Sequence, residues 1–371
     1  MASFSLPHPR GDRRPWGNRH GDEQCAPWTR VALLSVGGAV PAVAAGWYVW
    51  NNLTYSDREK EAVAEAGFIQ KQATIAGSEL NYAEGPDTGA ALLLIHGQVM
   101  DWRGWNRVLP ELSRRHHVFA VDCYGHGRSA RVPEKYRATA LAADLREFLT
   151  QVVGGPAIVA GHSSGGLIAA SLAADAPALV SRVVLEDPPF FSSVLPRAEK
   201  TFNDVDLATP AHEYLHSGER DFTAYYLQHG KMLDSFGEKI RKSALSYRRK
   251  HPGKPVELCY LPPAFNELFR AMDCYDPRFG DAFYDNSFHR DFDHAAVLSR
   301  ITVPALLIHT NWSYDADGIL LAAMSGEDAE RARSLLRDVE FHKVGSGHNF
   351  HFEDPRRFTR LVLAFTKRVP E

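Results

Sequence analysis

The sequence predicts an α/β fold with a mostly parallel sheet, because strand-length apolar runs alternate with segments of helical periodicity. Most of these runs are almost entirely apolar, as expected of strands that helices cover on both faces. One run also leads directly into a glycine-flanked serine and then into a helical segment. The apolar runs are Ala91–Ile95, Val118–Asp122, Ala157–Ala160, Arg182–Leu185 and Pro304–His309, and Val339–Val344 is a further strand-like run.

The glycine-flanked serine is Ser163, within the pentapeptide G-H-S-S-G at residues 161–165. It stands between the run Ala157–Ala160 and the helical segment Leu167–Ala174. A strand followed by G-x-S-x-G and a helix is typical of a nucleophile elbow, a turn so tight that the residues beside the serine must be small. Ser163 is therefore the predicted nucleophile.

Two glycine-containing loops offer partners for Ser163. The run Ala91–Ile95 ends in H-G-Q at residues 96–98, where the glycine lets the chain turn its next N–H toward a developing oxyanion. The amides of Gln98 and Ser164 are the predicted oxyanion donors. Far downstream, G-S-G-H at residues 345–348 follows a strand-like run. A glycine-flanked loop suits a general base that must reach the serine, so His348 is the predicted base.

At this point the chain resembles the α/β-hydrolase superfamily, in its serine-nucleophile branch. The resemblance runs from about residue 68 to the C-terminus, apart from a middle insertion, and includes D-C-Y-G-H-G-R-S at residues 122–129 and G-H at 347–348 followed by E-D-P at 353–355. It implies an eight-stranded, mostly parallel sheet with the site at the carboxyl ends of the strands. Asp122 and Ser129 are interpreted as structural turn residues.

The acid of the triad is the open point. In the family the carboxylate usually follows the seventh strand in a pattern such as G-x-x-D, but residues 310–313 here read T-N-W-S. Asp187, which ends the sixth strand and is fixed by two following prolines, is the favoured acid. Asp315 is the alternative, and Asp317 a weaker one. Asp187 as a plain turn residue stays open as well.

The predicted reaction is hydrolysis of an ester-type carbonyl of an apolar small molecule through an acyl-enzyme, without metal or organic cofactor. Lactone, thioester, amide or carbon–carbon bond hydrolysis on the same triad, and a non-hydrolytic ligand-binding protein on the same fold, are the alternatives. Relatives with haloalkane dehalogenase or epoxide hydrolase activity use a carboxylate nucleophile, which Ser163 is not. A formal net charge of −3 in 371 residues gives no reason to expect nucleic acid as a partner.

The predicted hydrolase core comprises residues 68–187 and 299–371, with a helical lid at 188–298. This insertion is too long for a plain loop, and four of its segments have helical periodicity. Its aromatic residues are expected to form mainly its own core, with an aromatic substrate pocket as the second possibility. Cys259 and Cys274 are either a disulfide pair or two buried thiols. The helical segments are Ala211–His216, Phe222–His229, Glu238–Lys250 and Ala264–Met272.

One competing constellation is H-R-D-F-D-H, running from His289 to His294. Imidazoles and carboxylates at this spacing can bind zinc or paired metals. No second His/Asp cluster completes such a site in the sequence, and the segment leads straight into the seventh strand. Solvated charge at a helix start is the preferred interpretation, so no metal is predicted.

The N-terminal region predicts a membrane anchor. Residues 31–50 carry no charge, which matches the span of a bilayer, and several arginines precede them. The positive-inside bias places residues 1–30, a predicted disordered tail, in the cytoplasm and the catalytic domain outside it. Residues 51–67 would be a linker. The alternatives are a signal peptide cleaved near residue 44, with a secreted enzyme, and a buried structural helix.

Overall fold

The computed structural model describes residues 28–367, with side chains from residue 43 onward except at residue 235. Its single sheet has the strand order β1-β2-β4-β3-β5-β6-β7-β8, which confirms the predicted fold class. The pairs β1/β2 and β2/β4 are antiparallel, and the remaining neighbours are parallel. The strands are β1 (Ile69–Ile75), β2 (Ser78–Glu84), β3 (Ala91–Ile95), β4 (His117–Val121), β5 (Ala157–His162), β6 (Val180–Glu186), β7 (Ala305–His309) and β8 (Val339–Lys343).

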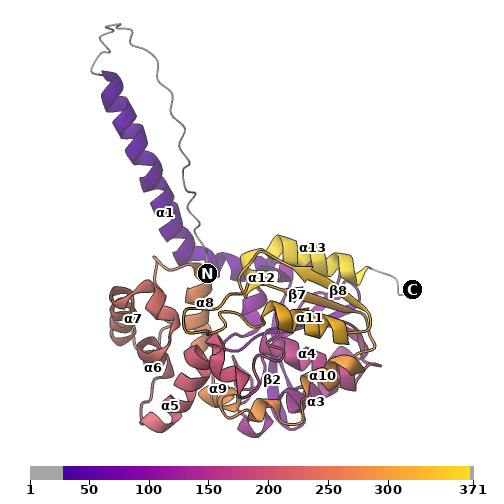
Figure 1. Ribbon diagram of the computed structural model, residues 1–371. Coiled ribbons are helices and arrows are strands. Elements are labelled where there is room, and N and C mark those ends of the chain that lie inside the picture. The colour runs from indigo at the N-terminus through magenta and orange to yellow at the C-terminus, as the bar shows by residue number, and fades with distance from the viewer. Residues whose placement is uncertain (1–27, 368–371) are drawn as a thin grey trace, which may run out of the picture.

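Helices flank the sheet on both faces, with α13 and α12 on one side and α3, α4 and α10 on the other (Figure 1). The helices outside the segment between β6 and β7 are α1 (Trp28–Glu65), α2 (Leu109–Leu112), α3 (Ala138–Phe148), α4 (Ser164–Asp175), α11 (Gly326–Leu335), α12 (Phe350–Glu353) and α13 (Pro355–Thr366).

The central strands are buried on both faces, which explains their continuous apolar sequence. In β3, Leu93 and Ile95 belong to the core cluster that includes α3 and α4. Leu92 and Leu94 point the other way, into the cluster that includes α2 and α13. Successive side chains of a strand face opposite sides of the sheet, so each run contributes to two cores at once. Both cores fix the carboxyl ends of the parallel strands, where the predicted site residues lie.

The segment between β6 and β7 is largely helical and contains α5 (Thr209–Ser217), α6 (Phe222–His229), α7 (Glu238–Lys250), α8 (Pro263–Met272), α9 (Pro277–Tyr284) and α10 (His294–Arg300). We call residues 188–298 the helical insertion. Phe190, Phe222, Tyr226 and Phe269 are buried in the main core cluster, whereas Tyr284 is exposed. Most of its aromatic residues thus pack within the fold, and its action as a lid stays a prediction. Cys259 and Cys274 are free thiols.

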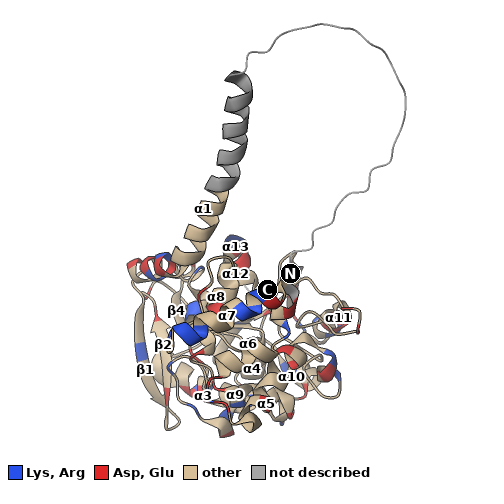
Figure 2. Cartoon of the chain, turned by 90° about the vertical axis from the view of Figure 1, so that its left-hand side faces the viewer, with Lys and Arg blue, Asp and Glu red and all other residues tan. Residues whose placement is uncertain are grey.

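Helix α1 extends well beyond the expected anchor. It continues without a break to Glu65, so residues 51–65 of the expected linker are helical. Charged residues return from Asp57 onward, at the base of the helix where it meets the rest of the protein (Figure 2). There Asn52 and Tyr55 are buried against other parts of the chain. Of the predicted tail, residues 1–27 lie outside the described residues, and residues 28–30 belong to α1.

The prediction of a membrane anchor over residues 31–50 is wrong. Across the portion of the chain described by the structure, no helix combines the length and the apolar character that crossing a membrane requires. The predicted single-pass arrangement, with a cytoplasmic N-terminus and an extracytoplasmic catalytic domain, depended on this anchor and is not supported either. Charge-free sequence was the basis of the prediction, but α1 also contains glycines, a proline and polar residues, and it continues into a charged segment that packs on the protein.

Candidate active site

Ser163 occupies a strained turn between β5 and α4. Its φ of 54° and ψ of −123° lie in a region that a residue other than glycine rarely adopts. A Cβ on Gly161 would lie 2.1 Å from the carbonyl oxygen of Gly165, and a Cβ on Gly165 would lie 2.3 Å from that of Ile95. Only glycine fits on either side, as the sequence predicts. The turn leaves Ser163 partly exposed at the end of β5.

The structure brings His348 and Asp187 into direct contact. Nδ1 of His348 lies 2.7 Å from Oδ2 of Asp187, although the two residues are 161 positions apart in the sequence. His348 stands in the loop between β8 and α12, and 37% of its side chain is exposed, whereas Asp187 is fully buried at the end of β6. Because Nδ1 donates its proton to the carboxylate, Nε2 is left as the proton acceptor.

Residues at the end of β7 hold the Asp187 carboxylate. The Thr310 hydroxyl donates to Oδ2 at 2.7 Å, and its amide donates to Oδ1 at 3.2 Å. Nδ1 of the buried His309 lies 3.4 Å from Oδ1. Burial opposes the charge of Asp187, but the hydrogen bonds from His309, His348 and Thr310 outweigh it and hold the pKa well below its usual range. Asp187 is therefore a carboxylate at neutral pH.

The same contact raises the pKa of His348. Burial disfavours its protonated form, but the hydrogen bond to Asp187 and the charge of that carboxylate outweigh burial, so the pKa lies above the usual 6.5. A neighbouring anion that stabilises an imidazolium is the arrangement a general base needs during proton transfer.

The two predicted oxyanion donors remain unused. Among residues 28–367, the amides of Gln98 and Ser164 donate to no acceptor. Ser164 opens the twelve-residue helix α4, whose N-terminus favours negative charge. A Cβ on Gly97 would lie 3.0 Å from Cβ of Ser163, so glycine lets the loop with Gln98 approach the nucleophile. Free amides beside a serine can stabilise a tetrahedral oxyanion.

A layer of buried histidines supports the loop of His348. Nε2–H of His162 donates to the carbonyl oxygen of His348 at 3.0 Å, and Nδ1–H of His351 donates to Glu186 at 2.9 Å. Burial lowers the pKa of His162 well below its ordinary value, which keeps the ring neutral. Within the described part of the chain, His162, Glu186 and His351 are the only three side chains whose ligand atoms gather closely enough, within 4.8 Å, to hold a metal ion. Hydrogen bonds already use most of these atoms.

The alternative acids lie elsewhere. Asp315 is exposed, and its Oδ1 accepts the amides of Asp317 and Ile319 at 3.0 and 2.8 Å, so it closes a local turn. Of the carboxylates considered from the sequence, only Asp187 contacts His348 in the described structure.

The His289–His294 segment does not assemble a metal centre. Nε2 of His294 lies 3.2 Å from Nδ1 of His289, but the carboxylate of Asp293 caps α10 by accepting the amide of Ala296 at 2.7 Å. Nδ1 of His294 accepts the amide of Phe191 at 2.7 Å. The two imidazoles therefore join the start of the helical insertion to its end.

Comparison with known proteins supports the fold described above. Residues 92–361 match the family model described as the alpha/beta hydrolase family. The chain belongs to this family. A putative 2-succinyl-6-hydroxy-2,4-cyclohexadiene-1-carboxylate synthase from Bacillus subtilis (strain 168) is 29% identical to this alpha/beta hydrolase over 329 residues, covering 86% of this chain and 98% of the relative. The magnesium-chelatase 30 kDa subunit from Rhodobacter capsulatus is 39% identical over 101 residues, and the match spans only 27% of this chain and 35% of that protein.

Solved structures support the fold of this alpha/beta hydrolase. A putative lipase from Acinetobacter baumannii AYE superposes with a TM-score of 0.60 at 21% identity, covering 85% of this chain and 95% of the lipase. A membrane phospholipase A, described as a bacterial virulence factor, superposes with a TM-score of 0.58 at 23% identity, covering 91% and 96%. At such identities the likeness concerns the fold alone.

Sequence reasoning missed the residues that surround this site. Thr310 follows the seventh strand, in the segment where the family usually has its acid in a pattern such as G-x-x-D. The absence of that pattern was the one signal in the sequence that this segment has another role. His162, Glu186 and His351 gave no signal, because their proximity depends on how β5, β6 and α12 meet.

The pH dependence of this hydrolase follows from the raised pKa of His348. Only the neutral imidazole accepts a proton, so we expect kcat/KM for an ester to fall about tenfold per pH unit below that pKa. The fall begins above pH 6.5 because the pKa of His348 is raised from that value. A pH–rate profile measures it, and Asp187→Asn should move the midpoint to lower pH. A rate that stays constant through this range would argue against His348 as the base.

If Ser163 and His348 carry the reaction, treatment with a chelator should leave the rate on an ester test substrate unchanged, because no step of a serine mechanism requires a metal ion. The measurement is the rate before and after EDTA treatment and desalting. Loss of activity that added zinc restores would instead point to His162, Glu186 and His351, the residues able to gather around an ion.

Proposed function

We propose that this alpha/beta hydrolase cleaves an ester-type carbonyl of an apolar small molecule through an acyl-enzyme formed on Ser163. The observation that carries the proposal is the 2.7 Å hydrogen bond between His348 and the buried Asp187. It fixes the imidazole tautomer, which leaves Nε2 to act on the serine of the elbow.

In the first half-reaction, Nε2 of His348 takes the proton of the Ser163 hydroxyl as Oγ bonds to the substrate carbonyl carbon. The carbonyl π electrons move to oxygen, and the amides of Gln98 and Ser164 stabilise the resulting anion. When the tetrahedral intermediate collapses, the bond to the alkoxy group breaks, and the leaving alcohol takes the proton from His348. The acyl group remains bonded to Ser163.

Water completes the reaction by the same route. It gives a proton to His348 while its oxygen attacks the acyl carbon, and the second intermediate expels Ser163, which recovers the proton. The products are a carboxylic acid and the free enzyme. A lactone, thioester or amide would pass through the same steps with a different leaving atom.

The apolar character of the substrate rests on the aromatic surroundings of Gln98. Its side-chain amide donates to the Tyr275 hydroxyl at 2.8 Å, and the Tyr275 ring lies 5.9 Å from that of Phe222 and 6.4 Å from that of Phe279. Apolar walls with a few polar groups are common in small-molecule sites. These rings are buried in the main core cluster, so they keep the surroundings of Gln98 apolar, which favours a substrate whose acyl or alcohol part is hydrocarbon.

A fluorophosphonate probe tests the proposal. We expect one label per chain, located on Ser163 by peptide mass, and no label on Ser163→Ala, because only an activated serine attacks the phosphorus. Equal labelling of the wild type and Ser163→Ala would assign the chemistry to another group. A wild-type protein that takes up no label and turns over no ester would instead be a non-hydrolytic binding protein on this fold.

A further inference from the structure

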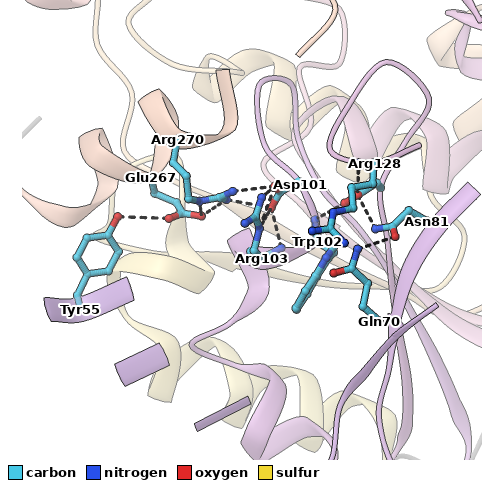
Figure 3. Close-up of polar contacts among 10 residues, drawn as sticks. Tyr55, Gln70, Asn81, Asp101, Trp102, Arg103, Arg128, Glu267 and Arg270 are labelled. Carbon is cyan, nitrogen blue, oxygen red and sulfur yellow. Dashed lines mark hydrogen bonds and ion pairs between the residues drawn. The ribbon is translucent and has the colours of Figure 1, made fainter. Parts of the chain in front are cut away.

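The loop that carries Gln98 ends in a buried ion cluster shared with the helical insertion. Asp101 is only 1% exposed, and Arg270 of α8 reaches it with two parallel hydrogen bonds, Nη1 to Oδ2 at 2.8 Å and Nη2 to Oδ1 at 2.9 Å. Arg103 adds a third contact, Nη2 to Oδ2 at 2.6 Å (Figure 3). Burial opposes the charge of Asp101, but the two guanidinium groups outweigh it and hold the pKa well below its usual range. Asp101 and Arg270 are thus a buried ion pair.

This ion pair lies close to the oxyanion donor along the chain. Only Val99 and Met100 separate Gln98 from Asp101, and Val99 adopts a φ of 56°, a conformation that a β-branched residue holds only when its surroundings impose it. Just after this segment, the backbone amide of Trp102 donates a hydrogen bond to Oδ1 of the buried Asp122, with an N–O distance of 2.8 Å. We call residues 97–101 the oxyanion loop. Gln98 is thus separated by only two residues from a carboxylate that Arg270 and Arg103 hold.

Two side chains of the helical insertion, as far as the structure describes the chain, form hydrogen bonds with the oxyanion loop. Besides Arg270 at Asp101, the Tyr275 hydroxyl accepts a hydrogen bond from the Gln98 side chain at 2.8 Å. Both partners lie in or just after α8, only five positions apart. A displacement of this part of the helical insertion would therefore pull on the loop at both ends.

The cluster in turn holds Arg270 in place. Glu267, one turn earlier on α8, accepts Nε of Arg270 at 2.8 Å and the Tyr55 hydroxyl of α1 at 3.3 Å. Arg270 thus lies between two carboxylates, Asp101 and Glu267, and only a planar guanidinium serves both with directed hydrogen bonds. Lysine keeps the charge but loses this two-sided geometry.

We propose that Arg270 is a positioning residue for the oxyanion hole, acting through Asp101 to orient the Gln98 amide. The helical insertion would then complete the catalytic site as well as border it. This inference rests on the proposed serine mechanism and assigns part of its transition-state stabilisation to a side chain that touches neither the substrate nor the reacting atoms.

The test compares Arg270→Lys with Arg248→Lys. Arg248 is a matched control, because it also lies in the helical insertion, its side chain is equally exposed at 12%, and it pairs with two carboxylates, Asp221 and Asp273, neither of which is in the oxyanion loop. We expect Arg270→Lys to lower kcat on p-nitrophenyl butyrate by roughly tenfold to a hundredfold, because small misplacements in a catalytic site cost about that much. Arg248→Lys should retain the wild-type kcat.

Three further measurements separate positioning from loss of folded protein. Active-site titration corrects kcat for the active fraction, and KM should change little. The inhibition constant of a trifluoromethyl ketone, whose adduct places an oxyanion in the same hole, should rise by the factor by which kcat falls. In an Asp101→Asn background, Arg270→Lys should cost almost nothing more, because both act through one contact.

Two results would overturn the inference. One is an Arg270→Lys enzyme whose titrated kcat and ketone affinity equal those of Arg248→Lys. The other is an Arg270→Lys loss that is as large in the Asp101→Asn background as in the wild type. If Ser163→Ala itself retains ester turnover, the proposed serine mechanism fails first. If turnover requires Ser163 but ignores Arg270, only the positioning role fails.

Discussion

Ser163→Ala should lower kcat on a short-chain p-nitrophenyl ester by about a thousandfold or more, and His348→Ala should lose nearly as much. The nucleophile and the base act as one unit, so removing both in Ser163→Ala/His348→Ala should cost little beyond either single change. Steady-state kinetics against the uncatalysed rate measure these losses.

Folding controls are simple for these variants. Alanine at position 163 removes only a hydroxyl group from a residue whose strained backbone is imposed by the β5–α4 turn, so the melting temperature should stay close to that of the wild type. A folded variant at either position that keeps a near-wild-type rate would remove the residue from the mechanism.

The second large effect is expected at the acid. Asp187→Asn should reduce kcat by about ten-thousandfold, as in the triad template, whereas Asp315→Asn should change it less than about twofold. Asp187 accepts hydrogen bonds from His348 Nδ1, the Thr310 hydroxyl and the Thr310 amide. In asparagine, one of the two accepting oxygens becomes an NH₂ group, which cannot accept a hydrogen bond from these donors. The amide also carries no negative charge to stabilise the imidazolium.

Asp315→Asn is the matched control, because it makes the same chemical change in an exposed turn after β7. Kinetics at a pH well above the midpoint separate a lost acid from a shifted base. The reverse ranking of the two variants would transfer the role of the acid to the loop after β7.

Much of the fold was accessible from sequence because the central strands are buried on both faces. The run Ala91–Ile95 coincides with β3, and Pro304–His309 differs from β7 by one residue. β1 carried no such signal, because its first four residues are exposed in a strand that pairs only with β2. An apolar run thus identifies a strand that is buried on both faces and misses an exposed edge strand such as β1.

The site was predictable in its local parts and open in its long-range parts. The elbow at Ser163 is a local turn whose glycines follow from sterics. The choice between Asp187 and Asp315 depends on which strand end approaches the His348 loop, and this distance joins residues 161 positions apart. At the N-terminus, the uncharged residues 31–50 predicted an anchor. In the structure they belong to one helix, α1, which continues through charged residues to Glu65.

The position of Asp187 also affects how this enzyme can be recombined with its relatives. The carboxylate that orients His348 stands at the splice point where the core ends and the helical insertion begins, followed at once by two prolines. Arg270 ties a second part of the insertion to the loop of Gln98. The insertion therefore cannot be exchanged freely. A chimera that carries another relative's segment from this junction onward must keep Asp187 and must replace the contact that Arg270 makes. Without them, we expect the chimera to bind new molecules but not to convert them.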